Sequence, residues 1–310
     1  MGDVNKQPER SHPPHLMSSS KQSKGAWYVG LSYVLWGFFP IYWKFLAGIS
    51  SLQLTCHRIV WSFLLLLALV GRSREWRGLW TAIRSPRVLG IYAAAAVTIA
   101  VNWLVFVWAA NRGQIVQTSL GYFINPLLSV VLGVLFFRER LRPLQWLSVA
   151  LAATGVLYLT VSLGTPPWIA LFLAASFGTY GLMKKIAPLS AVQGLALETS
   201  ILFAPAAAYL IWTEASGTGA LMHSGGMRDT LMVASGPVTT IPLLLFAAGV
   251  RRIPLSLVGM LQYVNPTMQI LIAVFMYREP FTRVQLTGFG LVWAALALFA
   301  VEGYMTRRLV

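Results

Sequence analysis

The stretch SLGYFINP occupies residues 119–126, and the stretch GMLQYVNP, which ends in the same Asn-Pro pair, occupies residues 259–266. The two pairs lie 140 positions apart, and each is followed at the same spacing by an Arg-Glu pair. The same register matches residues on both sides of these stretches: Lys44 with Lys184, Ser50 with Ser190, Gln53 with Gln193 and Gln145 with Gln285. A register that persists from Lys44 to Gln285 predicts two copies of one structural unit.

The composition indicates the class of protein. Of the 310 residues, 57% are hydrophobic and 11% are charged, whereas a soluble domain carries about 25% charged residues. This deficit predicts a polytopic membrane protein whose surface faces lipid. The net charge of +15 does not indicate nucleic-acid binding, because the basic residues fall in short loops between apolar runs rather than on one soluble module.

Ten segments are suited to cross a membrane, since a spanning helix needs about 20 predominantly apolar residues. They are residues 26–47, 50–71, 88–110, 114–137, 144–163, 168–186, 191–212, 230–250, 253–277 and 284–303. Each copy contains an odd number, five, so the second copy must lie inverted in the membrane. We therefore expect an all-α membrane protein built from a disordered cytoplasmic tail (1–24), a first repeat (25–164), a second, inverted repeat (165–305) and a short cytoplasmic tail (306–310). Inverted repeats of this kind underlie alternating-access transport.

The lysines and arginines in the loops predict the orientation, because cytoplasmic loops carry an excess of them. With both termini in the cytoplasm, 18 of the 24 basic residues lie inside, Lys184 and Lys185 among them, and four lie outside. Lys44 and Arg58 fall within spans. The loop 72–87 carries five arginines, whereas its repeat counterpart 212–227 carries none, which supports the inversion independently.

Prolines interrupt several spans, and four of them are candidate hinges for gating: Pro40, Pro126, Pro237 and Pro266. A proline within a membrane helix frees a backbone carbonyl, which then needs a partner in protein or water. The matched Asn-Pro pairs have two interpretations, as packing kinks or as hinges whose carbonyls line a cavity. Breaks in corresponding helices of both halves are typical of transporter binding sites.

Three charged residues within the spans stand out, Lys44, Arg58 and Glu198, because charge in the lipid core is costly and usually faces a cavity or a partner. Lys44 lies near the outer end of its span, from which its side chain can reach the interface. Arg58 and Glu198 are repeat counterparts. Each lies roughly 12 Å into a hydrocarbon core that is about 30 Å thick, one measured from one side of the membrane and one from the other. Either they form a salt bridge that locks the bundle, or they line a central site. In that site Arg58 would bind an anionic or polar substrate group, and Glu198 would take a proton or a cationic group. His57 is either a proton relay, because histidine titrates near neutral pH, or a packing residue.

Uncharged polar residues within the spans complete the candidate substrate-binding site. They are Asn102, Tyr122, Asn125, Tyr180, Gln262 and Tyr263. Many such groups form only interhelical hydrogen bonds, worth about 1 kcal/mol each. The cluster that precedes each Asn-Pro pair is the stronger candidate for a wall of the site, with Tyr122 and Gln262 at equivalent positions.

Several of these motifs resemble those of one transporter family. They are Ser119–Pro126, His57-Arg58 followed by Trp61-Ser62-Phe63, Asn102-Trp103, Tyr180-Gly181 with Lys184-Lys185, Glu198-Thr199 and Gln262-Tyr263. In this set the chain resembles the RarD proteins, a branch of the EamA-type transporters in the drug/metabolite transporter (DMT) superfamily. The resemblance covers residues 25–305 and implies two inverted five-helix EamA repeats in a bacterial cytoplasmic (inner) membrane. It also implies that helices 1–4 and 6–9 surround a central cavity, whereas helices 5 and 10 are peripheral.

The leading functional hypothesis is a secondary transporter, an exporter rather than an importer, that moves a small polar or amphipathic metabolite or drug. Glu198 and His57 are the candidates for proton coupling. The alternatives are a membrane-embedded enzyme and a non-transporting sensor or scaffold. We do not expect an enzyme, because the sequence lacks an HExxH motif, paired intramembrane aspartates and a glycine-rich phosphate loop with lysine.

No cofactor or metal is expected. The expected partners are the lipid bilayer, a small-molecule substrate and a coupling proton, with a second copy of the chain, as a homodimer, as a further candidate.

Overall fold

The computed structural model describes residues 19–73, 76–112, 115–162, 164, 166–278 and 282–308. Most of these residues are helical, and none of them lies in a strand. The elements in chain order are α1 (Ser19–Gly37), α2 (Phe39–Phe45), α3 (Ser51–Ser73), α4 (Trp76–Ile83), α5 (Pro86–Asn111), α6 (Ile115–Phe137), α7 (Pro143–Ser162), α8 (Trp168–Ile186), α9 (Ala191–Ala215), α10 (Gly226–Val250), α11 (Leu255–Gln262), α12 (Val264–Leu271), the π-helix η1 (Ile272–Met276) and α13 (Arg283–Arg308).

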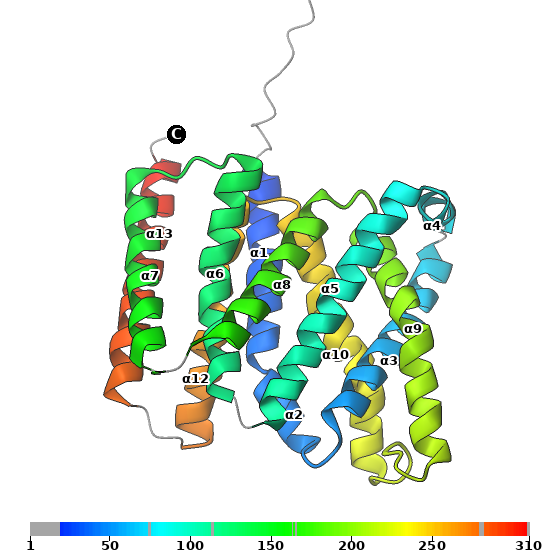
Figure 1. Ribbon diagram of the computed structural model, residues 1–310. Helices are drawn as coiled ribbons and strands as arrows, with labels where there is room; N and C mark the ends of the chain where they lie inside the picture. Colours follow the sequence, from blue (N-terminus) through cyan, green and yellow to red (C-terminus); the bar gives the residue numbers. More distant parts are fainter. Residues whose placement is uncertain are drawn as a thin grey trace, which may run out of the picture.

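Nine segments within the described ranges are long and apolar enough to cross a membrane, and they match nine of the ten predicted spans. The remaining prediction, 26–47, is divided between α1 and α2. The chain breaks there at Phe38, and Pro40 lies in the first turn of α2, where its missing N–H costs no helical bond. The α1 and α2 helices together extend through the same height as their neighbours (Figure 1). The predicted all-α membrane fold is therefore confirmed.

Successive spans run in opposite directions, and α1 begins at the same edge of the bundle at which α13 ends (Figure 1). Both end helices extend further toward the ends of the chain than predicted. The first, α1, begins at Ser19, within the tail predicted to be disordered, and α13 continues to Arg308. The rest of the N-terminal tail, 1–18, lies outside the described residues.

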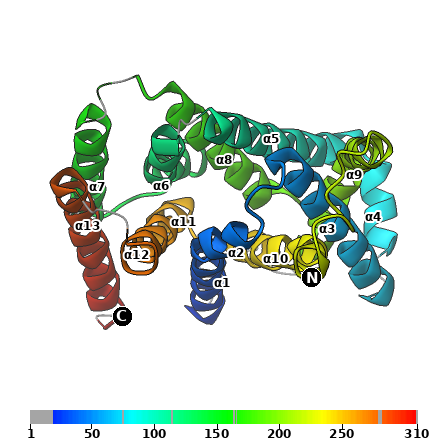
Figure 2. The ribbon, with the colours of Figure 1, turned by 90° about the horizontal axis from the view of Figure 1, so that it is seen from below.

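Helices of the two repeats pack in a pattern related by the repeat itself. Equivalent helices contact each other, since α3 packs on α9, α6 on α11, and α7 on α13. The contact between α1 and α10 likewise corresponds to that between α8 and α5. The α7–α13 pair lies at one end of the bundle beside α6 and α12 (Figure 2), in agreement with the peripheral position implied for the fifth and tenth helices.

The two halves differ in how they accommodate their Asn-Pro pairs. The α6 helix runs without interruption through Pro126, whereas its counterpart is broken at Tyr263, three residues before Pro266, and continues as α12 and η1. Pro126 removes one hydrogen bond from the ladder of α6, whereas Pro266 lies in the first turn of α12, where an N–H would have no helical partner. Only the second half therefore contains a discontinuous helix at this position.

One short helix was not predicted. The α4 helix lies in the arginine-rich loop 72–87, where Leu79 is buried and Trp80 is exposed. It packs against α5 and α9. Its alternation of a buried apolar face with an exposed tryptophan is typical of a helix at the membrane–water interface.

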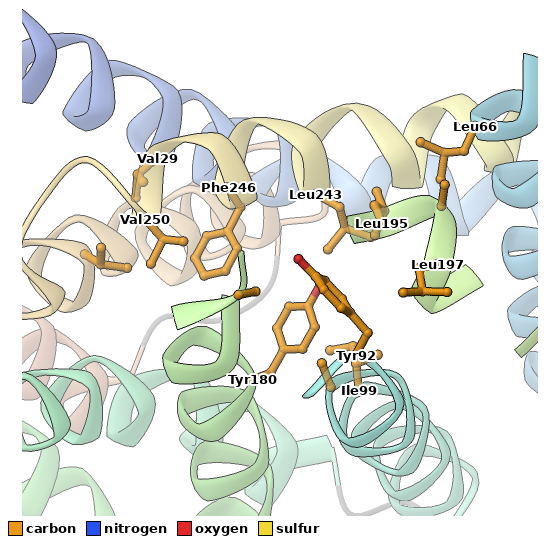
Figure 3. Close-up of a cluster of buried hydrophobic side chains, with 14 of the residues drawn as sticks. Val29, Leu66, Tyr92, Ile99, Tyr180, Leu195, Leu197, Leu243, Phe246 and Val250 are labelled. Carbon is orange, nitrogen blue, oxygen red and sulfur yellow. The ribbon is translucent and has the colours of Figure 1, made fainter. Parts of the chain in front are cut away.

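The largest buried cluster lies between the two repeats. It combines side chains of α1, α3, α5, α8, α9, α10 and α11, and its bulkiest members include Tyr33, Tyr92, Tyr180 and Phe246. Figure 3 shows part of this cluster, in which Tyr180 extends from α8 toward the region where Ile99, Leu195 and Leu243 come from three other helices. The helices that carry Arg58, Tyr180 and Glu198 thus meet around one centre.

Candidate functional site

A small cavity lies within this central cluster, between α3, α5, α8, α9 and α10. Its volume is about 20 Å³, which is room for about one water molecule. Most of the lining is apolar, and its polar members are Arg58, Ser62, Tyr180, Glu198, Thr199 and Thr239, with Trp103 beside them. Three of the predicted site residues, Arg58, Tyr180 and Glu198, therefore share one cavity.

Glu198 is fully paired on its side of the cavity. Its Oε1 accepts a hydrogen bond from the Lys184 Nζ at 2.8 Å, and its Oε2 accepts one from the Tyr180 hydroxyl at 3.1 Å. The side chains of Lys184 and Glu198 are 3% and 2% exposed, so this is a buried ion pair. Its two charges cancel, and the carboxylate pairs with lysine rather than with Arg58.

The position of Lys184 corrects the sequence analysis, which assigned it to a cytoplasmic loop. Lys184 lies in the last turn of α8, two residues before its end, and it is buried. Its ammonium also lies over the rings of Tyr180, at 5.6 Å from the ring centre, and Tyr92, at 5.9 Å. An aromatic surround of this kind helps to compensate for the water that a buried cation loses.

Arg58 lies across the cavity in a different environment. Its Nε donates a hydrogen bond to the Thr239 Oγ1 at 2.9 Å, and its guanidinium lies over the rings of Trp103, at 4.5 Å, and Trp43, at 5.2 Å. In the part of the chain that the structure describes, no carboxylate forms an ion pair with it. The phenol group of Tyr122 interacts electrostatically with the guanidinium, although Tyr122 does not line the cavity.

The remaining predicted site residues lie away from the cavity lining. Asn102 joins α5 to α8, because its Nδ2 donates to the Leu173 carbonyl at 3.0 Å and to the Ser176 Oγ at 2.8 Å. This is the interhelical hydrogen bonding that the sequence analysis kept as an alternative.

The cluster before the Asn-Pro pairs forms a second buried polar group. Gln262 accepts a hydrogen bond from the Tyr33 hydroxyl at 3.4 Å, and the Tyr263 hydroxyl donates to the Phe123 carbonyl at 3.3 Å. Asn125 is buried, and its Oδ1 has no partner among the described residues. None of these three residues lines the cavity that Arg58 and Glu198 share, and their place in one substrate site with Arg58 and Glu198 stays a prediction.

His57 is buried beside Arg58 in the chain, and neither of its ring nitrogens has a hydrogen-bond partner within the described ranges. The carboxylate that acts on it electrostatically is that of Glu214 rather than that of Glu198. Its role as a proton relay stays a prediction.

The four candidate hinge prolines differ in their local structure. Pro40 and Pro266 each lie within the first turns of a helix that follows a break, whereas Pro126 and Pro237 lie inside unbroken helices. Their function as hinges stays a prediction as well.

A second charged cluster closes the bundle at the end that contains the last turn of α8. Glu139, just after α6, accepts a hydrogen bond from the backbone N–H of Ser256 at 2.9 Å and another from that of Leu255, at the start of α11. Lys185 lies 3.8 Å from the same carboxylate and donates to the Ile253 carbonyl. A carboxylate at a helix N-terminus is favourable because it accepts from N–H groups that have no helical partner.

Sequence reasoning missed three residues that contact the charged groups of the cavity: Lys184, Thr239 and Trp43. The signal for Lys184 was present, because its repeat counterpart Lys44 was already counted as a membrane residue. No comparable signal existed for Thr239 or Trp43, since the face of a helix that turns toward a cavity depends on how the helices pack.

Comparison with known proteins agrees with the fold. Residues 23–161 match the family model described as the EamA-like transporter family. The chain is 42% identical to the "Uncharacterized transporter YojE" of Bacillus subtilis, covering 94% of this chain and 98% of that protein. It is 38% identical to "Protein RarD" of Escherichia coli, with 94% and 99% of the two chains covered.

Further matches extend this picture. An "Uncharacterized transporter" of Vibrio cholerae is 43% identical over 88% of this chain and 90% of its own. One crystal structure superimposes with a TM-score of 0.67 and covers 91% of this chain and 98% of the other, at 20% identity, which shows the likeness of fold alone. The chain therefore belongs to the RarD family, a bacterial branch of the EamA-type transporters within the drug/metabolite transporter superfamily.

Proposed function

We propose that this protein is a secondary transporter that exports a small polar or amphipathic metabolite or drug by alternating access. One observation carries the proposal. Arg58 and Glu198 occupy equivalent positions in the two repeats, and they line the same cavity in the centre of the bundle. Ionisable residues at that depth in a membrane protein mark substrate or ion pathways, and a site between inverted repeats is the arrangement that alternating access requires.

The cavity supports a cycle in which the central site is closed in one state and opens in others. A volume of about 20 Å³ cannot hold a metabolite, so the helices around it must move apart for loading. We propose that the break between α11 and α12 and the segments around Pro40, Pro126, Pro237 and Pro266 absorb this movement. The cluster of Glu139, Lys185 and the start of α11 would then close one end of the pathway.

The orientation follows from the loop charges. We propose that both termini face the cytoplasm and that the protein lies in the bacterial inner membrane. The loop 72–87 carries five arginines in the sequence, and its helix α4 lies at the same edge as the end of α13 (Figure 1), which supports this orientation. In this orientation the cluster around Glu139 lies on the cytoplasmic side.

Glu198 is the residue that we propose for proton coupling. Protonation of its carboxylate would break the charge balance of the Lys184–Glu198 pair and leave a buried ammonium without a counter-ion. A protonation step at this position therefore changes the relative energies of conformations that differ in the burial of Lys184. The resulting dependence of conformation on protonation is the physical requirement for coupling.

The proposal is tested with purified protein in proteoliposomes that contain a pH-sensitive dye. A panel of radiolabelled amino acids, carboxylates, amines and chloramphenicol is offered under a substrate gradient. We expect saturable flux of at least one compound, together with movement of protons. Formation of a chemically altered product without flux would instead show an enzyme, and the absence of flux for a panel member that binds saturably would contradict transport.

Variants separate transport from coupling. The Glu198→Gln protein should exchange labelled for unlabelled substrate across the membrane but should no longer move protons with it. The matched control is Glu214→Gln, a carboxylate that is 41% exposed near the end of the same helix. Proton movement that persists in Glu198→Gln would assign the coupling to another residue.

A further inference from the structure

We propose that the substrate is an organic anion, a carboxylate on an apolar or aromatic body, and that Arg58 is its counter-ion. This inference rests on the proposed transport function and names the substrate class of the same site. It follows from the charge, the hydrogen bonds and the shape of the cavity lining.

The charges around the cavity sum to one uncompensated cation. Lys184 and Glu198 cancel each other across 2.8 Å. Arg58 contributes a second positive charge, and no described carboxylate pairs with it. Arg58 is partly buried, and a charge removed from much of its water is stabilised by an opposite charge, so an anion beside the guanidinium would complete the site.

The hydrogen bonds of Arg58 leave the relevant face of the guanidinium available. Among the described residues, only Thr239 accepts from it, and that bond uses the Nε. The two terminal nitrogens therefore keep their N–H groups for a ligand. Parallel N–H groups of this kind match the two oxygens of a carboxylate on the ligand. A ligand with an ammonium group or a neutral amide in that place would pair with the guanidinium less well.

The aromatic neighbours hold this donor group in place. The rings of Trp103 and Trp43 lie near the guanidinium at 4.5 Å and 5.2 Å, and cation–π contacts of this kind fix its plane. A donor group fixed before binding loses less conformational entropy when the ligand arrives.

The other polar groups of the lining are already occupied. The Ser62 hydroxyl donates to the Gly236 carbonyl at 3.2 Å, and the Thr199 hydroxyl donates to the Leu195 carbonyl at 2.9 Å. Tyr180 donates to Glu198. Recognition of charge therefore depends on Arg58 alone, which fits a single anionic group rather than a dianion or a zwitterion.

The rest of the lining indicates the body of the substrate. Ile99, Leu195, Leu202 and Leu243 supply apolar surface from three helices around the polar end. A pocket with apolar walls and one fixed charged group binds an amphipathic ion whose apolar part excludes water.

The repeat gives a second, independent argument. The pair at positions 184 and 198 is lysine and glutamate, whereas the equivalent pair at 44 and 58 is lysine and arginine. The first repeat thus has no carboxylate at the position where Glu198 neutralises Lys184 in the second repeat. Lys44 cannot supply a negative group, and its ammonium lies over the Tyr277 ring at 3.7 Å. The carboxylate of the substrate would take the place that the repeat leaves without an anion.

The test compares matched ligands on the purified, full-length protein. The probes are benzoate and hexanoate, their neutral counterparts benzamide and hexanamide, and the cations benzylammonium and hexylammonium. Binding is measured by the midpoint of thermal unfolding and by tryptophan fluorescence, since Trp43 and Trp103 adjoin the site. We expect at least one carboxylate to bind more tightly than its amide and its ammonium counterpart.

Variants at Arg58 make the test specific. Arg58→Gln should lower carboxylate affinity by about 10- to 100-fold, the loss typical of a hydrogen bond to a charged group, and Arg58→Lys should retain part of it. Arg112→Gln is the matched control, because Arg112 also lies over a tryptophan ring, that of Trp108 at 5.1 Å, but is exposed. The carboxylate affinity of the Arg112→Gln variant should equal that of the unaltered protein.

Each outcome decides the inference. It is overturned if no carboxylate binds more tightly than its amide, or if Arg58→Gln binds as well as the unaltered protein. Flux of amides or amines but not of carboxylates in proteoliposomes would agree with the proposed transport function but contradict an anionic substrate. Carboxylate binding that depends on Arg58 but is never followed by flux would support the anion site and reject transport.

Discussion

Gly259 of α11 crosses α6 directly against Pro126, so closely that a Cβ atom at position 259 would lie 2.4 Å from the Pro126 carbonyl oxygen. The α6 helix, which carries the first Asn-Pro pair, and α11, which directly precedes the second, therefore meet at a point where only glycine fits. Because the contact is with backbone, a side chain at position 259 cannot be accommodated by a change of rotamer. The crossing of equivalent helices from the two repeats is thus fixed at this point.

Gly259→Ala should consequently force α11 and α6 apart. We expect a loss of about 1–3 kcal/mol in the free energy of unfolding, the usual cost of overpacking, and a reduced rate of substrate exchange. Gly290→Ala in α13, where an added Cβ meets nothing within 4 Å, is the control and should change stability by less than about 0.5 kcal/mol. The stabilities of the two variants are compared by unfolding of the detergent-solubilised proteins. Equal stability would refute the close crossing.

Lys184→Met should destabilise the protein strongly, because it leaves the Glu198 carboxylate buried without its counter-ion. The expected loss is about 3–5 kcal/mol, measured as a lower midpoint of thermal or denaturant-induced unfolding. The double variant Lys184→Met with Glu198→Gln should recover most of it, since no charge then remains. The comparison is Arg142→Gln. The Arg142 side chain, which pairs with Glu302, is 54% exposed, so its replacement should cost less stability. A Lys184→Met protein as stable as Arg142→Gln would contradict the buried ion pair.

Arg58→Met should have the opposite effect on the substrate-free protein. The side chain keeps the apolar stem but removes a cation that has no described counter-ion, so the midpoint of thermal unfolding should rise by a few degrees. Transport and carboxylate binding should be lost at the same time. Arg112→Met serves as the reference for a surface arginine. A destabilisation as large as that of Lys184→Met would mean that Arg58 is held by structural bonds rather than kept for a ligand.

Glu139→Gln should loosen the start of α11. The variant keeps an acceptor but loses the negative charge that favours the helix N-terminus and attracts Lys185, at a cost of about 1 kcal/mol. Backbone hydrogen exchange at residues 255–258 should accelerate by about fivefold, as followed by mass spectrometry. Glu214→Gln should leave these residues unchanged. Unaltered exchange in Glu139→Gln would show that the carboxylate does not hold this end of the bundle closed.

The sequence predicted the fold far better than the details of the site, for a physical reason. Helix number, direction and repeat register depend on hydrophobic length and loop charge, both of which can be read along the chain. Whether Asn102 faces a cavity or a neighbouring helix depends on the rotation of α5, which no periodic pattern fixes when lipid and protein interior are both apolar. The loop-charge count likewise cannot show that Lys184 turns inward, because it records only that a lysine lies near the end of a span.

The difference between positions 58 and 198 also has a consequence for energetics. If the two repeats were identical, exchanging their conformations would yield a state of equal energy, related to the first by a two-fold rotation. States open to the two sides of the membrane would then be equally populated. A guanidinium in one half and a neutralised carboxylate in the other remove that degeneracy. If the protein works by the alternating access proposed above, its substrate-free form should therefore favour one of the two states, and a ligand that compensates Arg58 should change the balance between them.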